Sequence, residues 1–597
     1  MSIYLKEFST HQEYEAFTAT TAFIKPNVSI CTTEGDAHYN PLVCEETTTY
    51  ELVGTPSYPS EIEGCDTGFT LSFNYKKTVI NRKCKEIVST GSDSIVVETE
   101  TNPSKANSRT INGNADYHGL EIPYSITQKP LEAIMTLYLN IPTTQEIYIL
   151  NTFDDKYRYD YVQLDNEEKI PNSNFSTWAP SGKRTLEAGN HVFKVWLTDV
   201  TIAKSPQCSS YITGATIPNT VTTMSSTFSE CTGLTRFDIP DSVTKLNNQT
   251  FKNCSALTAV TFSKNLTELG SQTFYNCRNL TGDIVLPDSV TSIGQASFNN
   301  CEKITSISIP EGVTVIKNAT FSNCKELNDV TFPSTLTTIE GQAFSSCNGF
   351  RNLYIGKNLT NISNDAFDYC SKLTSIVVSD ENTVYDSRNN CNALIETETN
   401  KLILGCKNTV IPNDIEVIGQ HAFYGVEGIT SVVLPNTVNS IGYYAFSRCY
   451  DLTSVTMSDN VTVINASAFQ SCSGLSNCVL SNNVTELDSD MFNGCKSLTQ
   501  LTLPSSLTII GNGTFRGCGF SAVDIPSGVT SIDNYAFADC TNLRSLTVRA
   551  TTPPTLYSTA MQGLSSELKI YVPAESVSAY KSASRWSTYG NQIYAIQ

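Results

Sequence analysis

The chain has 597 residues and a formal charge of −19, with 40% apolar and only 16% charged residues. Such a length is too great for one compact core and predicts several domains or an elongated repeat array. The acidic balance disfavours nucleic acid as a partner, because phosphate binding needs concentrated lysine and arginine, and it also disfavours an anionic membrane.

The beginning of the chain carries no recognisable export signal. Residues 1–30 include Lys6, Glu7 and Glu13 and lack a basic start followed by an apolar run, so no secretory signal peptide is predicted. No apolar run of about 18 residues occurs, which argues against a membrane-spanning helix and membrane insertion. We therefore expect synthesis in a reducing cytoplasm without export by the usual route.

Residues 1–48 are predicted to form a short helix followed by an extended piece. The run YLKEFSTHQEYEAF, followed by PNVSIC and DAHYNP, resembles the amino-terminal segment of virion proteins from crAss-like phages of gut Bacteroidetes. That resemblance implies that residues 1–48 attach the chain to other virion proteins. A generic β-rich start is the alternative.

Residues 49–130 are expected to form a β-sandwich. Short alternating runs are separated there by glycine, proline, asparagine and serine clusters, as in sandwich domains. The final stretch, SRTINGNADYHGLEIPYSITQ, resembles the last strands of BACON-type immunoglobulin-like domains. The resemblance implies an Ig-like fold, and it leaves open whether the domain binds carbohydrate or only mounts the rest of the chain.

Residues 131–205 are predicted to form a small β domain that caps a repeat array. Leu137, Leu139 and Ile141 alternate with polar residues, as do residues near Val195. The loop between them is acidic and aromatic, but it lacks EF-hand spacing or any other ligand order. We interpret it as a solvated loop rather than a calcium site or a pair of catalytic carboxylates.

A single phenylalanine recurs through the middle of the chain in steps of 23 residues, with one step of 24, one of 22 and one much longer. A period of this length is typical of leucine-rich repeats, in which an L-x-x-V-x-L run supplies one strand per coil of a parallel sheet. The phenylalanines should then form a continuous aromatic spine. They are Phe228, Phe251, Phe274, Phe298, Phe321, Phe344, Phe367, Phe423, Phe446, Phe469, Phe492, Phe515 and Phe537.

The repeat consensus, IPxxVTxIGxxAFxxCxxLTxVTLP, resembles that of the BspA-type leucine-rich repeat family. It implies a right-handed solenoid with a parallel sheet over 206–552, interrupted by an insertion at 380–406 and closed by a cap at 553–597. The expected fold class is therefore mainly β, with N-terminal Ig-like β-sandwich domains followed by this solenoid. Members of the family are typically surface or secreted adhesion proteins, which implies a binding scaffold rather than an enzyme.

Twelve of the twenty cysteines stand three residues after a repeat phenylalanine. Their regular spacing allows a disulfide ladder or a redox stack, but a small and weakly polar residue also suits a crowded turn. We predict buried free thiols. No pair has C-x-x-C spacing, so neither zinc nor any other metal or cofactor is expected.

Two features are candidates for ligand binding. The outward strand positions are small and neutral, and Tyr354 is the aromatic residue among them, whereas binding hot spots usually contain Trp, Tyr or Arg. The insertion 380–406 gathers polar side chains where the period breaks. The candidate residues are Tyr354, Asp386, Arg388, Asn389, Asn390 and Asn392. A solvated sheet face and a hairpin that only spaces the coils are the alternatives.

The sequence contains no catalytic motif. Its five histidines are scattered one per region, and no H-E-x-x-H, G-x-S-x-G or phosphate-binding glycine loop occurs. A depolymerase with two facing carboxylates is not excluded by sequence, because folding creates such pairs. We nevertheless expect a non-catalytic protein.

The predicted function is that of a phage virion-associated protein, a tail or head appendage that presents the solenoid for adhesion to a host surface glycan or protein. The predicted localisation is the virion, after synthesis in the host cytoplasm, and homo-oligomerisation is compatible with it. One alternative is a BspA-like adhesin at the bacterial cell surface or secreted from it. The other is a structural virion decoration without a ligand.

Overall fold

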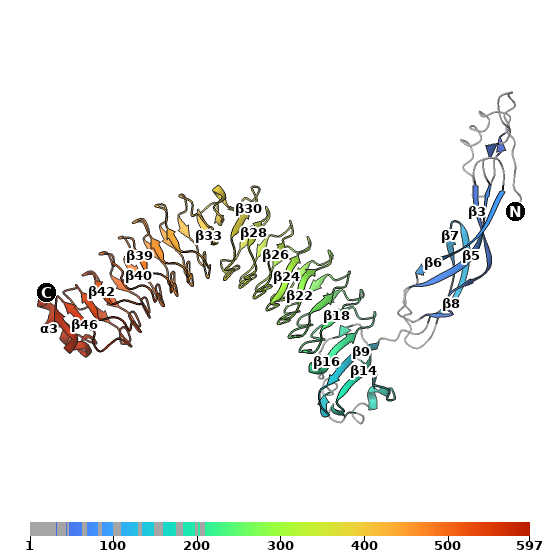
Figure 1. The fold of residues 1–597 in the computed structure, drawn as a ribbon, viewed down its shortest axis with the longest axis horizontal. Coiled ribbons are helices and arrows are strands. Elements are labelled where there is room, and N and C mark those ends of the chain that lie inside the picture. Colours follow the sequence, from blue (N-terminus) through green and yellow to red (C-terminus); the bar gives the residue numbers. More distant parts are fainter. Residues whose placement is uncertain are drawn as a thin grey trace. The chain divides into compact units, whose positions relative to one another are not determined.

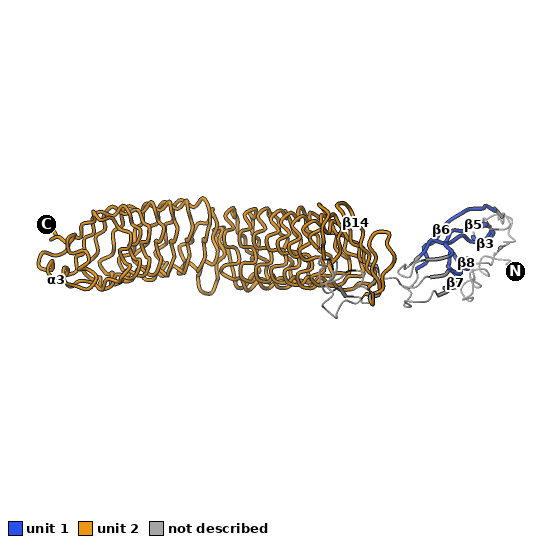
Figure 2. The backbone as a smooth tube through the Cα atoms, turned by 90° about the horizontal axis from the view of Figure 1, so that it is seen from below, with its two compact units in different colours: residues 1–134 blue, residues 135–597 orange. Residues whose placement is uncertain are grey.

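The computed structural model describes residues 31–32, 43–44, 47–62, 68–80, 86–98, 109–128, 134–148, 159–174, 179, 183–197, 201–202 and 209–597. The chain divides into two compact units, Met1–Ile134 and Met135–Gln597 (Figure 2). Most of the predicted attachment segment 1–48 lies outside the described residues. Within it, β1 (Cys31–Thr32) pairs antiparallel with β2 (Val43–Cys44).

Besides the pair β1 and β2, the described residues of the first unit form two three-stranded sheets. Because alternate residues of a strand share a face, Leu71 of one sheet and Ile122 of the other reach a common buried core. One sheet has the order β3 (Thr47–Ser57), β5 (Gly68–Ile80), β6 (Glu86–Glu98), and the other β4 (Glu61–Ile62), β8 (Leu120–Gln128), β7 (Arg109–Tyr117). The Ig-like topology of this unit remains a prediction.

The second unit begins with a small β domain. Its buried Leu137, Val162 and Phe193 belong to the same hydrophobic cluster as Val221 and Phe228 of the first coils, so this domain covers the apolar start of the solenoid. A five-stranded sheet has the order β12 (Ile170–Pro171), β11 (Tyr159–Leu164), β14 (Gly189–Leu197), β9 (Ile134–Ile141), β16 (Ile212–Thr216), and β10 (Gln145–Tyr148) pairs with β13 (Lys183–Leu186). Two 3-10 turns are η1 (Asn172–Asn174) and η3 (Ser209–Tyr211).

The solenoid coils stack in sequence order and contribute strands to two parallel ladders (Figure 1). The long-strand ladder comes from the L-x-x-V-x-L run. Its strands are β18 (Arg236–Asp238), β20 (Ala259–Thr261), β22 (Thr281–Val285), β24 (Lys303–Ser308), β26 (Asp329–Thr331), β28 (Asn352–Ile355), β30 (Ser375–Val378), β35 (Ser431–Val433), β37 (Ser454–Thr456), β39 (Asn477–Val479), β42 (Ala522–Ile525), β44 (Ser545–Val548) and β46 (Lys569–Val572).

The short-strand ladder lies on the return half of each coil, just before the phenylalanine. Its strands are β15 (Thr201–Ile202), β17 (Thr223–Met224), β19 (Lys245–Leu246), β21 (Glu268–Leu269), β23 (Ser292–Ile293), β25 (Val315–Ile316), β27 (Thr338–Ile339), β29 (Asn361–Ile362), β34 (Val417–Ile418), β36 (Ser440–Ile441), β38 (Val463–Ile464), β40 (Glu486–Leu487), β41 (Ile509–Ile510), β43 (Ser531–Ile532) and β45 (Thr555–Leu556). Parallel registers join equivalent residues of successive coils, as Ser440 pairs with Val463.

The repeat phenylalanines form two stacks rather than the continuous spine that we predicted. Ring centroids of successive coils lie 5.0–5.9 Å apart from Phe228 to Phe367 and again from Phe423 to Phe537. Among the described residues no ring contact joins Phe367 to Phe423. The insertion is the reason, because Gly405 lies so close to Phe423 that a Cβ there would be 2.0 Å from its ring.

The insertion folds as part of the solenoid. It contains β31 (Tyr385–Asp386), the turn η4 (Arg388–Asn390), β32 (Ala393–Glu396) and β33 (Lys401–Gly405). The strands β31, β32 and β33 pair antiparallel, and β33 then pairs parallel with β34 and so starts the short-strand ladder again. We call the boundary between the two phenylalanine stacks the seam. The buried core also divides into two clusters there.

The end of the chain closes the stack. The strand β47 (Ile593–Ala595) pairs with β46, and η5 (Ala574–Ser576), α3 (Val577–Ser582) and η6 (Trp586–Gln592) lie over the last coil. Tyr580 and Trp586 are completely buried, and their polar atoms donate to the carbonyls of Ala550 and Pro554. In the part of the chain that the structure describes, no helix is long and apolar enough to span a bilayer.

Candidate functional site

The outward face of the long-strand ladder carries a row of exposed apolar side chains around the seam. Tyr354 on β28 is 57% exposed, its register partner Val377 on β30 is 50% exposed, and Val433 on β35 is 71% exposed. Val285 and Val479 occupy the same strand position farther along the ladder and are also exposed. We call Tyr354, Val377 and Val433 the sheet-face row.

Tyr354 was predicted as a site residue, whereas the valines of this face were not. The signal was present in the repeat register, since each valine directly follows the middle buried residue of its strand, as Tyr354 does. A single exposed apolar side chain costs little free energy, but several on one face form a surface suited to a partner.

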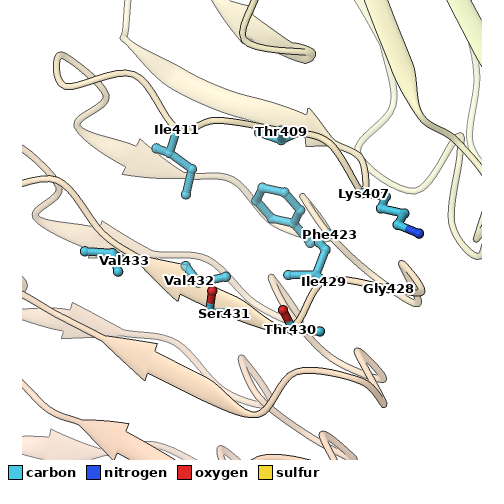
Figure 3. Close-up of a pocket in the computed structure, with 10 residues that line it drawn as sticks. All are labelled: Lys407, Thr409, Ile411, Phe423, Gly428, Ile429, Thr430, Ser431, Val432 and Val433. Atoms are coloured by element: carbon cyan, nitrogen blue, oxygen red, sulfur yellow. The ribbon is translucent and has the colours of Figure 1, made fainter.

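The long-strand ladder is interrupted at several places, and one of them is the seam. Among the described strands β35 pairs only with β37, so β35 is an edge strand of its sheet. A cavity of about 210 Å³ adjoins this edge, lined on one side by Thr430, Ser431 and Val433 of the β35 segment and on the other by Lys407 and Thr409. Figure 3 shows Phe423 lying between these two segments. An unpaired strand edge beside a cavity can accept an extended chain.

The predicted site residues of the insertion mostly satisfy one another. Arg388 makes two bonds to the Asp386 carboxylate, at 2.8 and 2.6 Å, and its other amino group donates to Asp414 at 2.7 Å and Asn400 at 2.9 Å. Although partial burial opposes it, the pKa of Asp386 is lowered because Arg388 stabilises the charged carboxylate. Asp414 and Asn400 were not predicted, since neither has a local sequence motif.

The three asparagines of the insertion serve its turns. Asn389, Asn390 and Asn392 have φ values of 58°, 53° and 53°, in the left-handed region that asparagine tolerates better than most residues. The structure therefore brings Asp386 and Arg388 together as an internal ion pair and uses the asparagines for backbone geometry. Tyr354 belongs instead to the sheet-face row.

Comparison with known families decides what these coils are. The family model described as the BspA type leucine-rich repeat region (6 copies) matches residues 201–317, 273–396, 395–520 and 467–583, which together span more than half of the chain. The chain belongs to the BspA-type leucine-rich repeat family. The BspA-type solenoid predicted from the repeat consensus is thereby confirmed, whereas the virion and BACON resemblances concern residues outside the matched range.

Several solved structures are similar to this BspA-type chain. A leucine-rich cell surface protein from Faecalibacterium prausnitzii is 28% identical with a TM-score of 0.42, covering 66% of this chain and 90% of that one. A leucine-rich repeat protein from Bacteroides ovatus is 25% identical with a TM-score of 0.42, covering 63% and 88%. The pneumococcal vaccine antigen PcpA is 16% identical with a TM-score of 0.40, covering 61% and 78%. No curated protein matches.

The BspA-type solenoid holds its cysteines as buried thiols. Successive coils repeat one contact, in which Cys449 Sγ donates to the Phe423 carbonyl and Cys472 Sγ to the Phe446 carbonyl, each at 3.0 Å. Burial raises the pKa of Cys449 to about 12. The fifteen cysteines described as free are all buried, which fits a packing role.

Two of the described histidines are hydrogen-bonded to aspartates. His191 Nδ1 lies 2.8 Å from Asp165 Oδ2, and His421 Nδ1 lies 2.8 Å from Asp368 Oδ2. Each pair joins segments far apart in sequence. Over the described ranges, no group of three or more His, Cys, Asp or Glu side chains is arranged to hold a metal ion.

Proposed function

We propose that this chain is a non-catalytic adhesion protein whose BspA-type solenoid binds an extended segment of a protein on a target surface. The observation that supports the proposal is the sheet-face row beside the open edge of β35. An added strand would pair with that edge through its backbone beside Val433, while the rest of the bound segment would cross the neighbouring strands and contact Val377 and Tyr354. A scaffold role also agrees with what the family resemblance implies.

The test compares binding of the full chain to intact target cells before and after the row is made polar. In the variant Tyr354→Thr, Val377→Thr, Val433→Thr, each position takes the residue that neighbouring coils carry at Thr331 and Thr456. We expect this variant to lose most binding. Thr547→Ser, on the same face in a distant coil, is the matched control and should bind normally. Equal binding by both variants would refute the proposal.

The setting that we propose is a bacterial cell surface, since the chain belongs to a repeat family for which surface display is the implied role. Carriage on a phage particle, with residues 1–48 as the attachment segment and 49–130 as an Ig-like mounting domain, is the second candidate, and it is motivated by the sequence resemblance of those residues. Antibodies raised against 209–597 should label intact producing bacteria. Labelling of purified particles instead, abolished by deleting 1–48, would favour the virion.

The absence of catalysis is part of the same proposal. It is supported by the lack of a catalytic motif in the sequence and by the bracing roles of the described His–Asp pairs. Incubation of the full chain with bacterial surface polysaccharides should release no new reducing ends. Release of reducing ends would show a depolymerase.

A further inference from the structure

Tyrosine and arginine side chains gather on one edge of the solenoid more densely in the coil of Phe446 than in the other coils. We define the turn edge as the residues from three before to four after each repeat phenylalanine. In the coil of Phe446, this edge carries Tyr443, Tyr444, Arg448 and Tyr450, all exposed. At the same positions the next coil has only small residues: Ala466, Ser467, Ser471 and Ser473.

The neighbouring coils extend this cluster across the seam. Tyr424 of the preceding coil lies 4.8 Å from Tyr369 between ring centroids, and their hydroxyls are 3.1 Å apart. Tyr444 lies 5.3 Å from His421 and 6.2 Å from Tyr424. Three adjacent coils therefore supply one continuous aromatic surface, which we call the turn-edge patch.

The side chains of the patch stand on a backbone conformation that recurs along the turn edge. The residues two before and two after the repeat phenylalanine are left-handed in most coils, and Tyr444 and Arg448 have φ values of 55° and 62°. Some coils have Asn323 or Gly494 at such positions, whereas others have larger residues such as Gln249. The turn edge therefore accepts side chains of different sizes, and the coil of Phe446 is distinguished by carrying three tyrosines and an arginine together.

The one cation of the patch has no internal anion. The Arg448 guanidinium lies 5.8 Å from the Tyr369 ring centroid, and in the described chain it makes no ion pair. A similar pair farther along the same edge differs in this respect. Arg516 lies 5.4 Å from the Tyr535 ring, but it is paired with Asp539 at 3.1 Å.

We propose that the turn-edge patch binds a carboxylate-bearing sugar residue. The Arg448 fork is suited to a carboxylate, with which it can form two parallel hydrogen bonds. The exposed rings of Tyr444 and Tyr450 offer flat apolar faces for a sugar ring, and their hydroxyls offer hydrogen bonds to its hydroxyl groups.

The size of the patch favours a sugar over a folded protein. Three coils about 4.8 Å apart span only about 10 Å along the solenoid, whereas a stable protein interface buries about 800 Å² on each partner. The small residues of the flanking coils would add little to such an interface.

The proposed sugar site is separate from the sheet-face row, so sugar binding at one and protein binding at the other can be refuted independently. The experiment titrates the full chain with trigalacturonic acid, its methyl ester and 3′-sialyllactose, and measures affinity by calorimetry. The test variants are Arg448→Ser, Tyr444→Ser and Tyr450→Ser, each of which introduces the residue of the next coil. Arg516→Ser and the triple sheet-face variant are the controls.

At least one acidic sugar should bind the wild-type chain, and esterification or Arg448→Ser should weaken binding about 10-fold or more, as expected for a charge-assisted pair. Both tyrosine variants should also weaken it, while both controls should bind normally. Equal affinity for acid and ester would overturn the proposal, as would unchanged binding by the patch variants or no binding of any acidic sugar. Loss of a protein partner alone in the patch variants would assign the patch to protein instead.

The variants should fold, because Ser467 and Ser471 occupy the equivalent left-handed positions with φ values of 59° and 60°. Circular dichroism and thermal unfolding check this directly. Arg448→Lys adds a second test that retains the charge but removes the planar fork. It should recover only part of the affinity lost in Arg448→Ser, whereas full recovery would overturn the assigned role of the fork.

Discussion

Most of the repeat thiols, such as Cys449 and Cys472, combine complete burial with a hydrogen bond to the preceding coil, and both features should make them unreactive. Because the thiolate is the reactive form, a pKa near 12 for Cys449 and Cys478 leaves almost none at pH 8. We expect the buried cysteines to resist iodoacetamide in the native chain and to react after unfolding in urea, except Cys254, whose pKa is lowered, despite its burial, by hydrogen bonds with Cys231 and Cys277. Mass spectrometry of the labelled peptides would identify each site. Rapid native labelling of these residues would contradict the buried-thiol assignment.

His191 provides a pH-dependent contact in the small β domain. Its Nδ1 faces Asp165 and its Nε2 lies 3.0 Å from the Glu187 carbonyl, so only the imidazolium can donate to both. Burial opposes the charge, but these two acceptors raise the pKa of His191. The stability gained is therefore fully present below about pH 6.5 and is lost as the pH rises through the folded-state pKa.

The direction of this pH dependence can be checked with the variant His191→Gln. The difference in hydrogen-exchange protection of β14 between wild type and variant should be large at pH 5.5 and small at pH 8.5. His421→Gln serves as a control for losing a histidine elsewhere in the same unit. A difference that grows with pH would show that His191 is held neutral.

At the scale of an element, the stability of the insertion depends on Arg388. This side chain joins Asp386 of β31 to Asp414 beyond β33, and it is only 21% exposed. Arg388→Ala should lower the stability of the hairpin by about 1–3 kcal/mol, because it leaves the partly buried Asp386 carboxylate without its partner. Faster hydrogen exchange in β31, β32 and β33 would report the loss. Arg236→Ala removes the ion pair with Asp238, in which the arginine side chain is 66% exposed, and it should change hydrogen exchange little.

The elements that could be predicted from sequence are those with a short period. The coil strands, the repeat phenylalanines and the positions of the cysteines all follow from residues within one repeat. The break of the aromatic stack does not, because it depends on Gly405 of the insertion meeting Phe423 of a coil. The partners of Arg388 were likewise hidden, since Asn400 and Asp414 carry no local signal.

The candidate sites, too, could be predicted from the sequence only in part. Tyr354 was identified because it is aromatic, while Val377 and Val433 were overlooked because valine at a strand position usually indicates core. The turn-edge patch was overlooked because its members lie on three coils, one of them separated from the others by the insertion. Comparing each coil position across the whole array, rather than reading along the chain, would have exposed both.

For the whole molecule, we expect the C-terminal cap to limit association between copies of the chain. Deleting 553–597 would uncover the last coil, including Leu543 and Leu546, which are completely buried in the intact chain. Repeat arrays need polar terminal units for solubility, so we expect this truncated chain to associate at concentrations where the full chain is monomeric. Sedimentation velocity over a range of concentrations measures the effect. A monodisperse truncated monomer would contradict the capping role.

The bonds between coils give the array a polarity. The Phe446 amide donates forward to the Ala468 carbonyl, whereas the Cys449 thiol donates backward to the Phe423 carbonyl, and the same pattern recurs from coil to coil. The first coil of one uncapped stack can therefore form these hydrogen bonds with the last coil of another, but two first coils or two last coils cannot pair in this way. Uncapped solenoids could therefore join only head to tail, a contact that never closes and that would grow into a filament. By covering the two ends of the stack, the terminal domains thus prevent the growth of a structure that could otherwise polymerise.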